Sequence, residues 1–196
     1  VGRLFSSGYD EIEAVDDLYS EESLAVNGLL GHGEGVTRLN TPTILPSMLG
    51  GELADSASAG EIHSLAIAAD GSVWSWGCAC RLGHGDDENQ LQPKKIEAFA
   101  GQRVIAVAAD LKHSLALTTD GGVWSWGGGL YGVLGHGDHE DQLLPKKIEA
   151  FADQRVVAVS AQNNMSVAIT ADGAVWSWGL NHGRGVVLGH GDEPTL

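Results

Sequence analysis

Histidine is the side chain best suited to acid–base and metal chemistry near neutral pH, and here it recurs within one short motif. Leu-Gly-His-Gly surrounds His32, His84, His136 and His190. A zinc ion needs its ligands to converge to within about 2.0–2.3 Å of it. These histidines are 52 or 54 residues apart, so each belongs to a different copy of a repeated unit. We therefore expect them to have a structural or turn-capping role, with neither a metal site nor a cofactor.

A second recurring histidine begins the sequence His-Ser-Leu-Ala. It stands at His63 and His113, whereas Met165 occupies the same position in the third copy. An active site needs its catalytic group once and not in every repeat, and no Ser/His/Asp set can be separated from the residues that the repeat carries. The glycine-rich stretches match neither of the phosphate-binding loop motifs. The sequence therefore predicts no catalytic residues, and a protein that is not an enzyme.

Six tryptophans form the third recurring pattern, which is Trp-Ser-Trp. They are Trp74, Trp76, Trp124, Trp126, Trp176 and Trp178. Side chains alternate along a strand, so both rings of each pair lie on the same side of it. Such rings could bind an aromatic ligand or absorb light. One pair per repeat at a fixed position favours packing between neighbouring repeats instead.

Seven carboxylates lie close together near the N-terminus, in a stretch without lysine or arginine. They are Asp10, Glu11, Glu13, Asp16, Asp17, Glu21 and Glu22. The commonest explanation of such a run is a solvated, disordered insertion. The alternative is an acidic arm for a basic partner, such as a histone surface or a basic peptide. These seven residues are our candidate partner-binding site.

The whole chain is acidic, with 26 aspartates and glutamates against 11 lysines and arginines and a formal net charge of −15. Direct binding to DNA or RNA needs a basic surface, so we exclude it. The apolar stretches are far shorter than the ~18 residues of a membrane helix, so we expect no membrane segment. The partners that remain are proteins.

The sequence contains only two cysteines, Cys78 and Cys80. Two cysteines in one short stretch exclude a disulfide framework and favour a reducing compartment, which for this chain means the cytoplasm or the nucleus. A lone Cys-x-Cys also lacks the second pair that zinc and redox motifs usually contain. We therefore interpret this segment as variation in a loop.

Internal repeats decide the fold class. Val-Trp-Ser-Trp-Gly begins at Val73, Val123 and Val175, with offsets of 50 and 52 residues. Each copy is preceded by Asp-Gly between two apolar runs, which is the strongest short signal for a β-hairpin and predicts a type I′ turn. In the second repeat the expected strands are 103–108, 114–118 and 123–126. Residues 96–99 could supply one further strand, and a short helical turn is the alternative.

Three or four strands in a repeat of about 50 residues indicate one blade of a β-propeller. We expect an all-β, partial propeller of three to four repeats. The repeat boundaries that follow from the sequence are 1–62, 63–112, 113–164 and a truncated 165–196. The first of these is a degenerate copy that contains the acidic insertion at 9–29.

The repeated run His-Ser-Leu-Ala-x-x-x-Asp-Gly-x-Val-Trp-Ser-Trp-Gly, followed by Leu-Gly-His-Gly-Asp and Pro-x-x-Ile, resembles the repeat of the regulator of chromosome condensation 1 (RCC1) family. The resemblance implies four-stranded antiparallel blades in a ring of about seven. It also implies a choice of functions, because one fold serves several. The founding member is a nucleotide exchange factor for the small GTPase Ran, and large ubiquitin ligases carry similar propellers as partner-binding modules.

The plant ultraviolet-B receptor has a similar repeat, with chromophore tryptophans two residues before the repeat histidine. Here those positions hold Glu61, Leu111 and Asn163, so light sensing is not expected. We expect a non-enzymatic protein-interaction module, as part of a longer regulatory protein. The alternative is guanine nucleotide exchange on a Ran-like GTPase. Because three or four blades cannot close such a ring, we also expect either further repeats or self-association through open blade edges.

Overall fold

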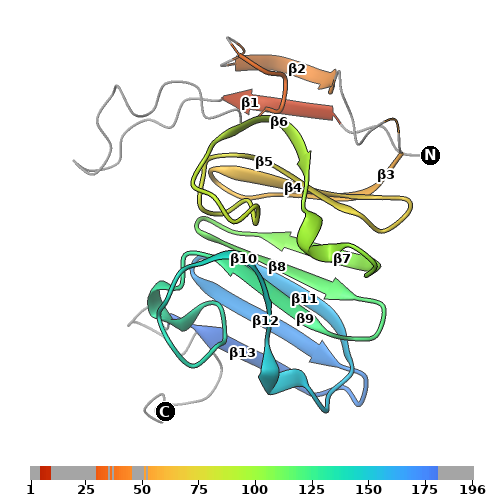
Figure 1. Ribbon diagram of the computed structural model, residues 1–196, viewed down its shortest axis with the longest axis vertical. Coiled ribbons are helices and arrows are strands. Elements are labelled where there is room, and N and C mark those ends of the chain that lie inside the picture. The colour runs from red at the N-terminus through yellow and green to blue at the C-terminus, as the bar shows by residue number, and fades with distance from the viewer. Residues whose placement is uncertain are drawn as a thin grey trace.

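The computed structural model describes residues 5–9, 30–34, 36, 38–45, 51 and 53–180 (Figure 1). Within these residues the regular structure consists of antiparallel strands and single-turn 3₁₀ segments. A hairpin of β1 (Phe5–Tyr9) and β2 (Arg38–Ile44) comes first along the chain. Three larger sheets follow, and they succeed one another along the long axis of the molecule (Figure 1).

The first two of these sheets have four strands each, in chain order. The first contains β3 (Ala54–Ala59), β4 (His63–Ala68), β5 (Val73–Gly77) and β6 (Gln90–Lys95). The second contains β7 (Val104–Ala109), β8 (His113–Thr118), β9 (Val123–Gly127) and β10 (Gln142–Lys147). The predicted all-β architecture with four-stranded antiparallel blades is confirmed by this topology. We call these sheets blade 1 and blade 2.

Blade 3 contains three strands among the described residues. They are β11 (Val156–Gln162), β12 (Met165–Thr170) and β13 (Val175–Gly179). Its outward sheet face is exposed: Val175 has 67% of its surface accessible, whereas its counterparts Val73 and Val123 have 0%. In blades 1 and 2 the same face is covered by the next sheet. Self-association through this open face stays a prediction.

The Asp-Gly turns form hairpins, but they are not of the predicted type I′. A type I′ turn needs positive φ at both central residues, and only Gly71 (φ 87°) has it in the first of these turns. Asp70 instead accepts a 2.8 Å hydrogen bond on Oδ1 from the Ser72 N–H. Glycine is required at position 71 because a Cβ atom there would lie 2.4 Å from Cγ of Arg103 in blade 2.

The fourth strand of each blade lies earlier in the sequence than we predicted. It is β6 in blade 1, and Glu97–Phe99 forms a 3₁₀ turn (η2), so the alternative of a helical turn is correct there. Blade 2 repeats this arrangement with β10 and the 3₁₀ turn η4 (Glu149–Phe151). A strand at 96–99 is wrong because Phe99 turns into the core between the blades, where it is 3% exposed.

Neighbouring blades pack face to face over an apolar core. Strand β7 of blade 2 contacts β3 and β4, and β11 of blade 3 contacts β7 and β8. The core between blades 1 and 2 contains buried side chains from both: Leu65, Ile67, Val73, Ile96, Phe99, Val104, Ala109, Ala116 and Trp126. Each interface is therefore built from one sheet face, one 3₁₀ turn and the inner strands of the next sheet.

Candidate functional site

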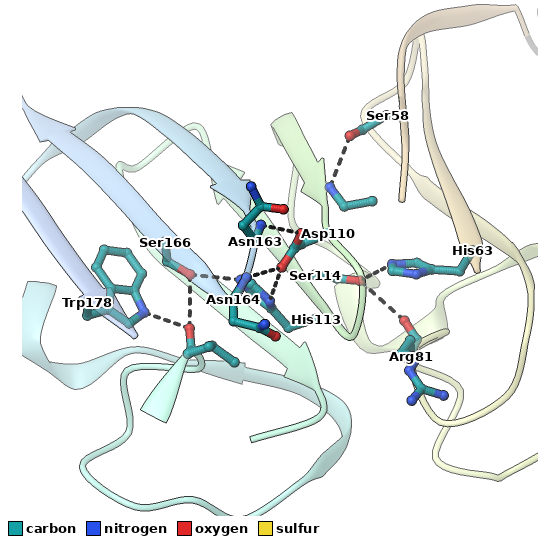
Figure 2. A network of polar contacts seen from close by, with 12 residues as sticks. Ser58, His63, Arg81, Asp110, His113, Ser114, Asn163, Asn164, Ser166 and Trp178 are labelled. Atoms are coloured by element: carbon teal, nitrogen blue, oxygen red, sulfur yellow. Dashed lines mark hydrogen bonds and ion pairs between the residues drawn. The ribbon is translucent and has the colours of Figure 1, made fainter. Parts of the chain in front are cut away.

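The polar residues of the repeat meet at the boundaries between blades, as Figure 2 shows. His63, at the start of β4, is fully buried, and its Nε2 lies 2.8 Å from Oγ of Ser114 in blade 2. The Ser114 hydroxyl donates to the Arg81 carbonyl at 3.3 Å. Because the single hydroxyl proton of Ser114 is used in that hydrogen bond, Nε2 of His63 is the donor in the contact between His63 and Ser114. The histidine thus links blade 1 to blade 2.

The same arrangement links blade 2 to blade 3. Nε2 of His113 lies 2.8 Å from Oγ of Ser166, and the Ser166 hydroxyl donates to the Val133 carbonyl at 2.9 Å (Figure 2). A tryptophan of the following blade reaches the same loop carbonyl at each boundary. Trp126 Nε1 donates to Arg81 at 2.9 Å, and Trp178 Nε1 donates to Val133 at 2.7 Å.

Asp110, His113 and Ser166 have the connectivity of a serine-hydrolase triad, but the chemistry of one is blocked. The contacts are 3.3 Å from Asp110 Oδ2 to His113 Nδ1 and 2.8 Å from His113 Nε2 to the serine. However, Ser166 is 0% exposed, and its hydroxyl proton is directed to a backbone carbonyl and not to the histidine. A nucleophile needs both access and a base that accepts its proton. The set is therefore structural.

Asp110 joins two blades by binding a turn of blade 3. Its Oδ1 accepts the N–H of Asn163 at 2.8 Å, and its Oδ2 accepts the N–H of Asn164 at 2.9 Å (Figure 2). Burial of the carboxyl raises its pKa, but the contacts with His113 and with backbone N–H groups outweigh this effect and hold the pKa at about 2. We call this arrangement the Asp110 clamp.

The turn that the clamp binds has an unusual backbone. Asn163 and Asn164 have φ values of 53° and 61°, in the left-handed region that few residues other than glycine adopt. We expect Asn164→Ala to lower the free energy of unfolding by about 1 kcal/mol, because alanine is disfavoured at such a φ. Asn164→Gly keeps the bound N–H and should leave the stability near the wild-type value. Urea denaturation of both variants checks this, and equal losses would contradict it.

Blade 1 lacks this clamp, because Gly60 occupies the position that corresponds to Asp110. A Cβ atom at residue 60 would lie 2.3 Å from the Asp110 carbonyl oxygen, so the two turns approach too closely for any side chain. Among the described residues Nδ1 of His63 has no hydrogen-bond partner, and neither has Nδ1 of His113, although the latter lies 3.3 Å from Asp110 Oδ2. Burial, followed by the positive charge of Arg81, lowers the pKa of His63 to about 3.

This buried neutral histidine predicts sensitivity to acid. The folded pKa of His63 is about 3, whereas an unfolded histidine titrates near 6.5, so the unfolded state takes up protons first as the pH falls. We expect His63 alone to lower the free energy of unfolding by roughly 2 kcal/mol between pH 7 and pH 4.5. His63→Gln should remove this share of the loss and leave the share that comes from the other histidines with lowered pKa values, His84 and His136. Urea titrations at several pH values test it, and an unchanged pH slope in the variant would contradict it.

Two of the Leu-Gly-His-Gly histidines, His84 and His136, each contact a serine of their own blade. His84 Nε2 contacts Ser75 Oγ at 2.9 Å, and His136 Nε2 contacts Ser125 Oγ at 3.0 Å, while each serine donates to the nearby leucine carbonyl. Burial, then the charge of Lys94, lowers the pKa of His84 to about 4. His190 lies outside the described residues. In the part of the chain that the structure describes, no three His, Cys, Asp or Glu side chains gather as metal ligands would.

The tryptophan pairs lie at the blade boundaries. The ring of Phe99 from blade 1 meets Trp124 and Trp126 of blade 2 with centroid distances of 5.7 and 5.8 Å. The ring of Phe151 meets Trp176 and Trp178 in the same way, at 5.4 and 5.7 Å. In blade 1, Trp76 packs against Leu45, and Trp74 lies beside the same cluster. Edge-to-face aromatic contacts of this kind stabilise packed cores.

The remaining residues that the sequence singles out are the carboxylates near the N-terminus and the two cysteines. Asp10, Glu11, Glu13, Asp16, Asp17, Glu21 and Glu22 lie outside the described residues. Cys78 and Cys80 are free thiols, and burial raises the pKa of Cys80 to about 11, so it stays protonated at neutral pH. No helix within the described ranges is long and apolar enough to cross a bilayer.

A polar hollow of about 620 Å³ lies where the first turns of the three blades converge. It is lined by 58–61 of blade 1, 109–111 of blade 2 and 161–164 of blade 3. Sequence reasoning did not single out these turns as a site. The available signal was the residue three positions before His63, His113 and Met165. Gly60, Asp110 and Gln162 stand there and differ, while the flanking strands repeat.

The sheets and their repeated boundaries define the class of protein, which is a β-propeller built from four-stranded antiparallel blades. The family model described as "Regulator of chromosome condensation (RCC1) repeat" matches residues 70–117 and 120–169, and a second model of the same description matches 104–133. The chain therefore belongs to the RCC1 repeat family.

Several known proteins resemble the chain over most of its length. It is 42% identical over 174 residues to the E3 ubiquitin-protein ligase HERC2 of Mus musculus. The matched region covers 86% of the chain and 4% of that protein. It is 39% identical over 170 residues to the ultraviolet-B receptor UVR8 of Arabidopsis thaliana, covering 85% of the chain and 38% of the receptor. The chain thus spans less than half of each of these relatives.

Among solved structures, Prp20p from Saccharomyces cerevisiae matches with a TM-score of 0.67 and 26% identity over 80% of the chain and 40% of that structure. That structure is described together with the binding of Prp20p to Gsp1p and histones. Human WBSCR16 matches with a TM-score of 0.69 at 23% identity, over 78% of the chain and 40% of that structure, which supports the fold alone.

Proposed function

We propose that this part of the protein is a non-enzymatic module that binds another protein. The observation that carries the proposal is a contrast between scaffold and surface. The scaffold uses its repeated polar groups internally, since His113 and Ser166 are both 0% exposed and bonded between blades. The exposed turns differ from blade to blade. Differences presented on a rigid scaffold are typical of recognition surfaces.

The hollow supports this proposal. At the same position of the three turns it presents Glu61, Leu111 and Asn163, one from each blade. An acidic, an apolar and an amide side chain on one repeated backbone cannot all serve the same structural purpose. Its lining residues include two carboxylates, Glu61 and Asp110, and no lysine or arginine. A surface of this polarity suits a protein segment that brings hydrogen-bond donors or positive charge.

Two assays with the purified chain test the proposal. The first measures release of fluorescent GDP from a Ran-type GTPase, and we expect no acceleration over the uncatalysed rate. The second measures binding to core histones and to the same GTPase by calorimetry, because Prp20p is described as binding proteins of these two kinds. A dissociation constant below about 10 μM for either supports the module. Accelerated release would establish exchange activity and overturn it, and so would a lack of binding to both proteins.

The acidic residues 10–22 are a second candidate surface within the same proposal. We propose that they bind a basic partner by charge attraction, which salt screens over about 10 Å at 0.1 M. Deleting residues 10–22 should weaken binding to histones at least fivefold at low salt and leave the melting temperature unchanged. Unchanged affinity would remove this segment from the proposal.

A further inference from the structure

The loop that follows Trp-Ser-Trp-Gly has different lengths in blades 1 and 2, although it ends at equivalent positions in both. It has four residues in blade 1 (78–81) and six in blade 2 (128–133). Both loops finish at equivalent points, since the carbonyls of Arg81 and Val133 accept the same two bonds from the next blade. Because the ends are fixed in this way, the two extra residues of blade 2 must bulge outward.

The bulge places apolar side chains in water. Leu130 is 49% exposed and Tyr131 is 44% exposed, at the 3₁₀ segment η3 (Leu130–Gly132). The corresponding residues of blade 1, which are 78–81, are only partly exposed, and none of them is a large apolar side chain. Two adjacent large apolar side chains, each about half exposed at a loop tip, leave apolar surface in water that a partner protein could cover.

The tip is held rigidly in this conformation. The Gly129 N–H donates to Asp141 Oδ1 at 2.8 Å, and the N–H groups of Gly132 and Gly135 continue the turn with two 3.0 Å hydrogen bonds. Gly129 packs directly on the 138–141 segment, where a Cβ atom would lie 2.1 Å from the Glu140 carbonyl oxygen. Tyr131 itself has a φ of 65°, a left-handed value that is unfavourable for tyrosine. A preformed tip of this kind binds without losing much conformational entropy.

The segment beneath the tip is acidic. Residues 138–141 read Asp-His-Glu-Asp, and Glu140 and Asp141 are exposed. One cation lies close by, because a Cβ atom on Gly128 would be 3.4 Å from Cβ of Lys112. Three carboxylates against one lysine leave the surroundings of the tip negative.

We propose that Leu130 and Tyr131 insert into an apolar pocket, bordered by lysine or arginine, on a partner protein. This rests on the proposed function, because it names the surface and the chemistry of the partner for a binding module. The aromatic ring would supply most of the contact, since tyrosine is enriched among the residues that dominate interfaces. The carboxylates of 138–141 would match the basic border of the pocket.

The test places the photo-cross-linking residue p-benzoylphenylalanine at position 131 of the full chain, and at the exposed Thr119 in a second version. Both are irradiated in an extract of the source cells, and the cross-linked peptides are sequenced. We expect cross-links from position 131 to peptides with apolar residues flanked by at least two lysines or arginines. Raising the salt from 50 to 300 mM should reduce their yield at least fivefold.

Matched variants distinguish a loss of partner binding by Leu130 and Tyr131 from a loss of stability of the fold. Leu130→Ser with Tyr131→Gly should reduce capture of the cross-linked partner at least tenfold and leave the melting temperature unchanged or higher, because glycine accepts the left-handed φ. Ile105→Thr, at an apolar residue 50% exposed on β7, should leave capture unchanged. If the partner is retained by the double variant, or if position 131 cross-links only to acidic peptides, the tip is wrong and the binding module stands. If position 131 gives no cross-link while the wild-type chain binds histones or the GTPase, the proposed role of Leu130 and Tyr131 is wrong. If position 131 gives no cross-link and the chain binds neither of them, the proposed binding module is wrong.

Discussion

Trp126→Ala should lower the free energy of unfolding by about 3–5 kcal/mol, which is a large part of the stability of a domain of this size. Trp126 is 0% exposed and lies in the core between blades 1 and 2, against Phe99. Its removal leaves a large cavity and takes the indole donor away from the Arg81 carbonyl. Chemical denaturation monitored by circular dichroism measures the loss.

Two further substitutions show which part of this effect is packing. Trp126→Phe keeps most of the ring and loses the hydrogen bond, so we expect a loss of about 1–2 kcal/mol. Trp176→Ala, at a residue 38% exposed on the open blade, should cost less than half as much as Trp126→Ala. Equal losses at positions 126 and 176 would show that the depth of burial does not set the contribution of the tryptophan.

Asp110→Ala should lower the free energy of unfolding by about 3 kcal/mol, because it removes charge-assisted hydrogen bonds from two backbone N–H groups and leaves the buried His113 without its carboxylate. Asp110→Asn keeps the shape and an acceptor oxygen, so its loss should be smaller. Thermal and urea denaturation of the two variants provide the measurement. If alanine and asparagine give the same small loss, the clamp contributes little to joining the blades.

The clamp also has a pH signature of defined sign. The pKa of Asp110 is held at about 2 in the folded protein, below its value of about 3.9 in an unfolded chain. Its contribution is therefore complete above pH 4 and is lost as the pH falls through 2. We expect the stability difference between wild type and Asp110→Asn to shrink by about 2 kcal/mol from pH 5 to pH 2. A difference that does not depend on pH would contradict the proposed ionised clamp.

The strands that the sequence predicts correctly are those whose signals are local. Apolar alternation and the Asp-Gly turns identify the hairpins of each blade, because a strand pair connected by a short turn is specified by neighbouring residues. The turn type was wrong for one reason that is not local and for one that is. Gly71 lies against Arg103 of the next blade, and Asp70 binds the Ser72 N–H instead of adopting a left-handed φ.

The blade boundaries could be predicted only in outline. Repetition indicates that the tryptophans pack between repeats, but it does not reveal that Phe99 of one blade covers the tryptophans of the next. The role of Asp110 could not be predicted, because its partners Asn163 and Asn164 are more than 50 residues away. They also contribute backbone N–H groups, which carry no sequence signal. The sequence does not distinguish Leu130 and Tyr131 from other loop residues, since their exposure is known only once both ends of the loop are placed.

The bonds from His63 and His113 run in one direction, each from a blade to its successor. Blade 2 therefore carries a complementary pair of surfaces, a serine that receives the bond and a histidine that gives the next one. A gene duplication that adds a unit of this kind needs no new interface. Coupling of this kind is between nearest neighbours, and stability grows with the number of units much as in a one-dimensional polymer. Among the described blades, blade 2 is bonded to a blade on each side, so its amide hydrogens should exchange slowly.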